Sequence, residues 1–300
     1  MTKWTARDIP DLTGRVAVVT GANSGLGWET SLQLARHGAR VVLACRDETR
    51  GQEALGRIAA QVPDASLELA LLDLSDLASV RKFADASLAE RHRLDVLVNN
   101  AGIMALPERR TTADGFEMQF GVNHLGHFAL TGLLLPVLLT SSARVVSVTS
   151  FAHRMGRISF DDLHSERGYR KWWVYGHSKL ANVLFTFELD RRARAAGTGL
   201  VAAVAHPGFA ATHLQDDTSF SPLRVFAQSP AEGALPVLYA AVAPDVAGGQ
   251  FFGPDRFFGL RGHPKRVKAA ARARDLGTAR RLWDASEDLT GVVYDWSMSS

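Results

Sequence analysis

Short apolar runs alternate with longer amphipathic segments along most of the chain. The runs are rich in Val, Leu and Ala and cover residues 15–20, 39–45, 67–73, 94–100, 143–150 and 199–207. Strands that are almost continuously hydrophobic are typical of a sheet that is buried on both faces. The pattern therefore predicts buried strands and does not indicate the half-solvated strands of an open antiparallel sheet.

The segments between these runs predict helices. They cover residues 26–37, 48–61, 77–91, 113–139 and 173–195, and a seventh strand is expected near 248–254. Alternation of strand and helix indicates a parallel sheet with right-handed crossovers and helices on both faces. We expect an α/β fold, a Rossmann-type doubly wound sheet of about seven strands, in a single domain over residues 1–300. Ligands of such sheets bind beyond the carboxyl ends of the strands.

Composition agrees with a globular protein and narrows the chemistry. Of the 300 residues, 46% are hydrophobic and 22% are charged, and Cys45 is the only cysteine. One cysteine excludes an internal disulfide and any multi-cysteine metal site. The ten histidines form no array with zinc-ligand spacing, so we expect no metal.

The net charge is only +3, but basic residues cluster in 263–281. We interpret this stretch as a solvated helix face over packed alanines. A nucleic-acid surface is the alternative, and the absence of interleaved aromatic residues argues against it. The N-terminus lacks the apolar run of a signal peptide, and nowhere do 18 apolar residues follow one another. We therefore expect a cytoplasmic protein with no membrane span.

The first predicted strand leads directly into the glycine-rich sequence TGANSGLG, residues 20–27. Glycine permits a tight turn and lets the backbone approach a pyrophosphate at the N-terminus of the following helix. The spacing departs from G-x-G-x-x-G, but its place between strand and helix predicts a dinucleotide site. The expected contacts are Gly21, Asn23, Ser24, Gly25, Leu26 and Gly27.

The end of the second strand bears on which dinucleotide is bound. Cys45 stands where an NAD-binding sheet usually carries an acid, and Arg46 follows it. A guanidinium suits the 2′-phosphate of NADP(H), which is therefore favoured, with NAD(H) as the alternative. Arg46 could instead pair with Asp47 or Glu48 at a helix start.

Tyr175 and Lys179 are four residues apart on a predicted helix and so share one face. This pair, the glycine loop and NNAG (99–102), in this order, resemble the short-chain dehydrogenase/reductase family over residues 14–254. The sequences GVNHLGHFALT (121–131) and YGHSKLANVLFT resemble its retinol-dehydrogenase-like branch.

The resemblance implies a catalytic set of Asn123, Ser150, Tyr175 and Lys179. Tyr175 would be the general acid in carbonyl reduction and the base in alcohol oxidation. Lys179 would favour the phenolate and hold the nicotinamide ribose, Ser150 would bind the substrate oxygen, and Asn123 would anchor a water. Their completeness argues against a catalytically silent dinucleotide-binding regulator. A light-dependent tetrapyrrole reductase would need an active-site cysteine, which Cys45 is not placed to supply.

The same comparison implies further cofactor contacts beyond the glycine loop. Asp73 and Leu74 would flank the adenine, although Asp73 could instead cap a helix. The remaining contacts would be Asn99, Ala101, Gly102, Pro207, Gly208 and Thr212. Tyr175 and Lys179 would also touch the cofactor.

Substrate specificity is expected to come from an insertion at 151–174 and a loop at 209–230, with a helical extension at 255–300. The two loops carry many apolar residues, which suits an apolar alcohol or carbonyl substrate. These are Phe151, Met155, Trp172, Trp173, Phe209, Leu214, Phe220, Leu223 and Phe226. We expect residues 213–230 to act as a lid. The helices that carry Asn123 and Tyr175 are a subunit contact in the family, so a homodimer or homotetramer is expected.

Overall fold

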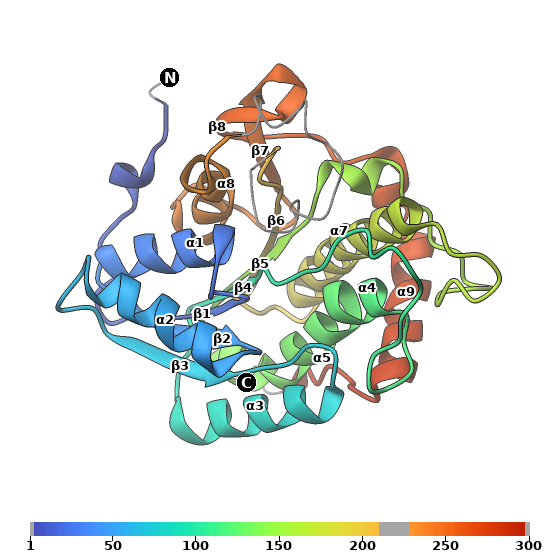
Figure 1. Cartoon of the computed structure of the whole chain (residues 1–300), viewed down its shortest axis with the longest axis horizontal. Coiled ribbons are helices and arrows are strands. Elements are labelled where there is room, and N and C mark those ends of the chain that lie inside the picture. The colour runs from blue at the N-terminus through green and yellow to red at the C-terminus, as the bar shows by residue number, and fades with distance from the viewer. Residues whose placement is uncertain (1–2, 210–227, 298–300) are drawn as a thin grey trace.

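The computed structural model describes residues 3–209 and 228–297, and its centre is one eight-stranded sheet in the order β3-β2-β1-β4-β5-β6-β7-β8 (Figure 1). β1 to β7 run parallel, and β8 is antiparallel to β7. The strands are β1 (Val16–Thr20), β2 (Arg40–Cys45), β3 (Leu67–Leu71), β4 (Val96–Asn99), β5 (Arg144–Val148), β6 (Val201–Ala205), β7 (Phe251–Arg256) and β8 (Arg261–Arg266). The doubly wound parallel sheet is confirmed, with one strand more than the sequence predicts.

Helices cover both faces of this sheet. They are α1 (Gly25–Arg36), α2 (Glu48–Ala59), α3 (Leu77–Glu90), α4 (Met118–Phe120), α5 (Gly126–Leu133), α6 (Leu135–Thr140), α7 (Lys171–Ala195), α8 (Pro230–Val242) and α9 (Leu276–Thr290). Side chains of α1, α2 and α8 share one hydrophobic cluster, and those of α3, α5, α6, α7 and α9 share another. The sheet is therefore the middle of three layers.

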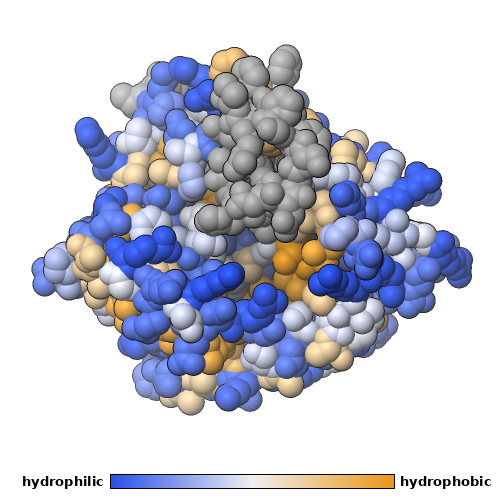
Figure 2. Space-filling view, viewed as in Figure 1, coloured by the Kyte–Doolittle hydropathy of each residue, from blue (hydrophilic) through white to orange (hydrophobic). Residues whose placement is uncertain are grey.

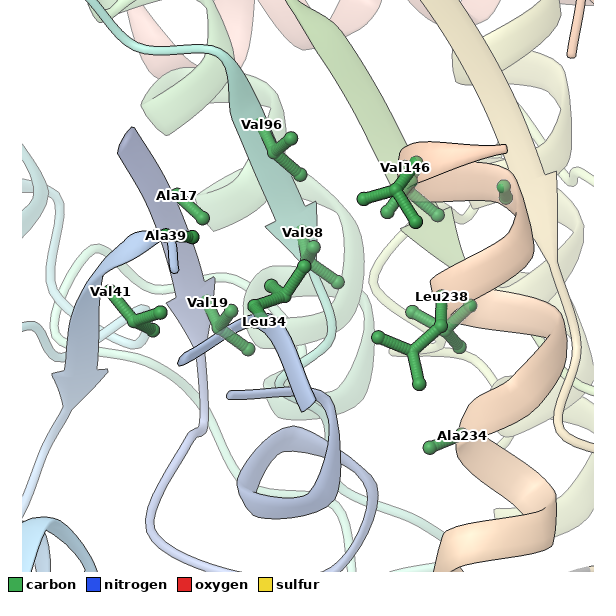
Figure 3. Close-up of a cluster of buried hydrophobic side chains, with 14 of the residues drawn as sticks. Ala17, Val19, Leu34, Ala39, Val41, Val96, Val98, Val146, Ala234 and Leu238 are labelled. Carbon is green, nitrogen blue, oxygen red and sulfur yellow. The ribbon is translucent and has the colours of Figure 1, made fainter. Parts of the chain in front are cut away.

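Alternate residues of each strand point into opposite layers. Ala17 and Val19 belong to the cluster with α1 and α8, whereas Val18 belongs to the other. Figure 3 shows the first cluster, where Leu34 of α1 and Leu238 of α8 lie against the strands. Burial on both faces explains why these strands are continuously apolar, as the sequence pattern indicates.

The segment 113–139 differs from its prediction as one helix. Helix begins only at Met118, and Gly121–Leu125 forms a π-helical turn before α5. Such turns insert one residue into a helix and are frequent at functional sites. A proline at the start of α6 is accompanied by a further break after Leu133.

The C-terminal region also corrects two expectations. The extension at 255–300 is not helical throughout, because residues 255–256 complete β7 and the charged stretch 261–266 forms β8. The basic stretch 263–281 is likewise α-helical only from Leu276, after a 3₁₀ turn at Ala271–Arg274, although Ala269, Ala273 and Ala279 are buried beneath it as expected. Helix α8 has no counterpart among the predicted helices.

Helix α9, red in Figure 1, packs against α7. Its Trp283 is 1% exposed, and the ring lies 5.1 Å from that of Phe128 on α5 and 5.8 Å from that of Phe185 on α7. The chain thus covers part of the helix face that the resemblance assigns to subunit contact. An oligomer that used this part of the face would have to displace α9.

Within the described residues, none of the helices has both the length and the hydropathy that a membrane crossing requires.

Candidate active site

A cavity of about 1120 Å³ lies at the carboxyl ends of the parallel strands. The loops that follow β1, β2, β3, β4, β5 and β6 line it, as the topology of such sheets requires. Figure 2 shows hydrophobic surface, coloured orange, gathered in a hollow near the centre of the drawn face. The expected site residues that line the cavity are Gly21, Asn23, Ser24, Gly25, Leu26, Gly27, Arg46, Asp73, Leu74, Ala101, Gly102, Ser150, Tyr175, Lys179, Pro207 and Gly208.

The glycine loop has a backbone that other residues would strain. Gly21 and Gly25 have φ angles of 65° and 54°, in the left-handed region. A Cβ on Gly27 would overlap the carbonyl oxygen of Gly21. Ser24 is the N-cap residue of α1, but its side chain makes no capping hydrogen bond. The first amide groups of α1 are therefore available to an anion, which fits the pyrophosphate of a dinucleotide.

Two arginines line the cavity just beyond the end of β2, the strand next to the glycine loop. Arg46 and Arg50 both line it and are exposed, and neither forms a salt bridge within the described residues. The alternative pairing of Arg46 with Asp47 or Glu48 is absent from the structure. Asp47 instead caps α2 by accepting a hydrogen bond of 2.9 Å from the backbone amide of Arg50. The sequence pattern does not predict Arg50 as a site residue, because it reaches the cavity from the first turn of α2 and not from a strand end.

The NNAG loop is held by Thr20 at the end of β1. The Thr20 hydroxyl accepts from the amides of Asn100 and Ala101, each at 2.9 Å. Asn99, expected to touch the cofactor, does not line the cavity: it is 1% exposed, and its amide donates to the Thr131 hydroxyl at 3.0 Å. Strand alternation turns Asn99 toward α5, so its neighbour Asn100 faces the cavity instead.

Tyr175 and Lys179 lie on α7 with their side chains at the cavity wall. They are 7% and 5% exposed. The Lys179 ammonium nitrogen lies 5.8 Å from the centroid of the Tyr175 ring. Ser150 follows β5 and approaches the phenol closely enough to lower its pKa by hydrogen bonding. The structure thus brings the three expected residues together.

Burial controls the protonation of this group of side chains. It raises the pKa of Tyr175 to about 12, and the Ser150 hydrogen bond opposes only part of that rise. It lowers the pKa of Lys179 to about 8. The resemblance implies that Lys179 favours the phenolate. In the structure, desolvation is the largest effect on the pKa of Tyr175.

Asn123 is fully buried behind the cavity wall and does not line it. Its side chain accepts from the amide of Ile103 at 2.8 Å and donates to the Ile103 carbonyl and the Ser178 hydroxyl. A Cβ on Gly102 would lie 3.1 Å from Asn123 Oδ1 and 3.3 Å from Lys179 Nζ. Asn123 therefore fixes the loop next to Lys179.

Three other expectations have different outcomes. Asp73 does not cap α3, because Asp76 is the N-cap residue of that helix. The carboxylate of Asp73 instead accepts hydrogen bonds from the amide and hydroxyl of Ser75. Thr212 lies outside the described residues. So do Leu214, Phe220, Leu223 and Phe226, with most of the expected lid at 213–230.

The remaining wall of the cavity is apolar. The residues that line it are Ile103, Met104, Leu106, Met118, Val122, Phe151, Met155, Trp172, Trp173 and Phe209. Those in the two predicted loops were expected, whereas the residues at 103–106 and 118–122 were not. No signal in the local sequence distinguishes them from packing residues.

A hydrogen-bond network holds the backbone at 104–106. Gln119 accepts from the amide of Ala105 at 2.7 Å and donates to the Tyr169 hydroxyl at 2.9 Å. Tyr169 donates in turn to the carbonyl of Leu106 at 2.9 Å. Ala105 has a φ angle of 50°, a strained value for a residue other than glycine. The network therefore supports the turn that presents Met104 and Leu106 to the cavity.

Cys45 lies outside the residues that line this cavity. It is 1% exposed at the end of β2. Burial raises the pKa of its thiol to about 11. Among residues 3–209 and 228–297, no group of His, Cys, Asp and Glu side chains could hold a metal ion.

Known proteins are similar to this chain in sequence and in architecture. The family model described as short chain dehydrogenase matches residues 15–221. Mouse retinol dehydrogenase 12 is 43% identical over 295 residues, which cover 95% of this chain and 89% of the relative.

Solved structures give the same result. An uncharacterized protein from Mycobacterium paratuberculosis has a TM-score of 0.83 and 45% identity, covering 98% of this chain and all of its own. Pseudomonas aeruginosa RhlG, solved as a complex with NADP, has a TM-score of 0.65 and 27% identity, covering 80% and 94%. The chain therefore belongs to the short-chain dehydrogenase family, in its retinol-dehydrogenase-like branch.

Proposed function

We propose that the protein is an NADP(H)-dependent oxidoreductase that interconverts an apolar alcohol and its aldehyde or ketone. Membership of the family supports an oxidoreductase acting on alcohols and carbonyls. The single observation that carries the finer proposal is the convergence of Ser150, Tyr175 and Lys179 on one cavity. That cavity runs from an uncapped helix N-terminus to an apolar wall.

The protonation of Tyr175 suits it to donate a proton. With its pKa raised to about 12, the phenol is protonated at neutral pH and can donate to a carbonyl oxygen held beside it by Ser150. The bound nicotinamide would supply or accept the hydride. Lys179 donates to the carbonyl of Val148 at 3.3 Å, which keeps the ammonium beside Tyr175. Asn123 holds the Ile103 backbone and, through Ser178, is tied to α7.

The preference for NADP(H) rests on Arg46 and Arg50. Two exposed guanidinium groups without acidic partners create a positive potential at the cavity end where the 2′-phosphate of the adenosine ribose would lie. Charge-assisted hydrogen bonds to phosphate are stronger than those to a ribose hydroxyl. The NADP in the complex of the related RhlG supports this preference.

The apolar wall indicates the substrate class. Aromatic and thioether side chains of Met104, Met118, Met155, Trp172 and Trp173 offer adaptable surface to a bulky hydrocarbon group. Arg110 also lines the cavity, but it is exposed and belongs to the mouth. An apolar aldehyde such as retinal, the kind of substrate that the name of the retinol dehydrogenases indicates, fits this lining.

The test is a screen of carbonyl compounds and alcohols in the dark. Retinal, aliphatic and aromatic aldehydes, ketones and polar sugars would each be incubated with NADPH or NADH, and cofactor oxidation followed by absorbance. We expect turnover of apolar carbonyls with NADPH that is independent of light. Binding of NADPH without turnover of any compound would favour a silent regulator and overturn the proposal.

A further inference from the structure

A second cavity, of about 270 Å³, lies between the β7–β8 hairpin and the 3₁₀ turn Phe151–Arg154. It shares the side chain of Phe151 as a wall with the main cavity. The charged residues that line it are four cations, Arg154, Lys265, Arg266 and Lys268, and one acid, Asp255. The second cavity therefore has a strong excess of positive charge.

These cations have no carboxylate partner among the residues that the structure describes. None of the four forms a salt bridge within the described part of the chain. Asp255 accepts a hydrogen bond of 2.9 Å from the backbone amide of His263. Arg154 instead lies over the Phe151 ring, with 5.1 Å between the guanidinium carbon and the ring centroid. Their charge is thus left for a ligand or for solvent.

A buried histidine adds a neutral hydrogen-bonding group to these cations. His206 lines the second cavity and is 5% exposed. Its Nδ1 accepts from the backbone amide of Gly208 at 3.2 Å. Burial, His153 and Arg154 lower its pKa to about 3, so the ring is neutral at physiological pH. A neutral ring that accepts at Nδ1 must carry its proton on Nε2.

Nδ1 makes the hydrogen bond of this ring, and the Nε2–H group has no hydrogen-bond acceptor among the residues that the structure describes. A Cβ on Gly253 would overlap Nε2, so the ring can occupy its position only because residue 253 is glycine. His206 lines the cavity, so a ligand bound there could supply the acceptor. The donor favours a ligand with an acceptor atom, and the surrounding cations favour a negative one.

We propose that the second cavity is an anion-binding site, separate from the dinucleotide site, for the carboxylate or phosphate group of a small molecule. One anionic oxygen accepts from Nε2 of His206, and the neighbouring Arg and Lys side chains balance its charge. The volume and the apolar walls of Phe151, Phe251 and Pro254 limit the ligand to a small organic anion. A cation or a neutral hydrocarbon would leave the donor and the charges unpartnered.

The experiment titrates the full chain with inorganic phosphate and, separately, benzoate. The readouts are the ¹H–¹⁵N signals of the histidine rings and calorimetry, with sodium chloride at equal ionic strength as the control for screening. We expect a saturable change at His206 with at least one of the two anions and none with chloride. The anion that responds identifies the group that the site prefers.

Variants separate this site from the rest of the surface. His206→Asn places a carbonyl oxygen where Nδ1 accepts from Gly208 but removes the Nε2 donor, and we expect at least a tenfold loss of affinity, about 1.4 kcal/mol. The exposed pair Arg266→Gln with Lys268→Gln should cause a similar loss without affecting folding. Arg280→Gln, an exposed cation on α9, is the control for a charge change elsewhere and should have no effect.

The proposal fails if the His206 signals respond equally to chloride or do not saturate. It also fails if the Arg266 and Lys268 variant binds as tightly as the Arg280 variant. Neither readout depends on turnover or on a dinucleotide, so these outcomes are independent of the proposed oxidoreductase activity.

Discussion

Tyr175 is subject to two opposing electrostatic effects. Burial raises the pKa of the phenol, whereas the hydrogen bond with Ser150 lowers it. Replacing Tyr175 by Phe removes the transferable proton and keeps the ring. We expect the rate of carbonyl reduction to fall by about 100-fold or more. Single-turnover kinetics with NADPH would measure it, and unchanged NADPH affinity and melting temperature would exclude a folding defect. A Phe variant that keeps its rate would show that Tyr175 is not the acid.

The same pKa sets an asymmetry between the two directions of reaction. Alcohol oxidation needs the phenolate as base, and a pKa raised toward 12 means that only a small fraction is ionised near neutrality. We therefore expect kcat/KM for oxidation to rise with pH, about tenfold per pH unit where the phenol limits the rate. Reduction needs the protonated phenol and should not rise over that range. Parallel pH profiles for the two directions would contradict this assignment.

Arg46 and Arg50 determine the choice of dinucleotide in the proposed function. Losing a charge-assisted phosphate contact costs about 1.5–3 kcal/mol. Arg46→Ala and Arg50→Ala should each weaken NADPH binding by about 10-fold or more and leave NADH binding nearly unchanged. Lys82→Ala, which removes an exposed charge from α3, is the matched control. Equal affinity of the unmodified protein for both dinucleotides would refute the preference.

At the scale of elements, the insertion 151–174 supports one wall of the proposed substrate site through Tyr169, which holds the turn at 104–106. Tyr169→Phe removes the hydrogen bond to the Leu106 carbonyl. It also removes the hydroxyl that accepts from the side-chain amide of Gln119, whose other acceptor is the Lys171 carbonyl. The strained turn at Ala105 then loses support, so Met104 and Leu106 should become less well positioned. We expect KM for bulky apolar substrates to rise several-fold while kcat and the KM for NADPH change little.

Tyr239→Phe is the control for Tyr169. It also removes a tyrosine hydroxyl that donates a hydrogen bond, here to Asp245, but it lies on α8 and does not line the cavity. A uniform loss of kcat in the Tyr169 variant, or an equal effect of both variants on KM, would mean that Tyr169 has no positioning role.

Local patterns in the sequence predicted the parts of the site that depend on neighbours along the chain. Helix periodicity is sufficient to place Tyr175 beside Lys179, and a strand followed by glycines predicts the loop at 20–27. Contacts between distant segments were not predictable. Gln119 meets Tyr169 50 residues later, and the side-chain amide of Asn100 donates to the carbonyl of Thr20, 80 residues earlier.

The elements missed have physical reasons of the same kind. Strand β8 lies at the edge of the sheet and none of its residues is fully buried. It is rich in charged residues and therefore lacks the continuous apolar run that marks the buried strands. The segment at 113–117 looks helical by composition, but Glu117 turns back to accept from the amides of Gln119 and Phe120 and starts the helix there.

At the scale of the whole molecule, buried histidines make stability depend on pH, and four of the five buried ones that the structure describes have a strongly lowered pKa. Burial lowers the pKa of His124 and His206 to about 3 and that of His127 and His177 to about 4. Each folded-state pKa is below the unfolded value of about 6.5, so the unfolded chain binds protons first as pH falls. The stability that the neutral rings provide is complete above that value and is lost as pH falls toward the folded pKa.

This predicts acid sensitivity well above the range in which most carboxylates titrate. For each of these histidines, the free energy of unfolding should fall by about 1 kcal/mol when the pH is lowered from 6.5 to 5.5. Denaturant titrations at the two pH values would measure the sum. His177→Leu should make this pH-dependent loss of stability smaller by the contribution of one histidine. Leucine is tolerated there because the Nε2 of His177 has no hydrogen-bond partner within the described residues and the ring packs on Phe120. His92→Gln, at an exposed position, should leave this loss unchanged. An unfolding free energy that is equal at both pH values would contradict the burial of these four rings in neutral form.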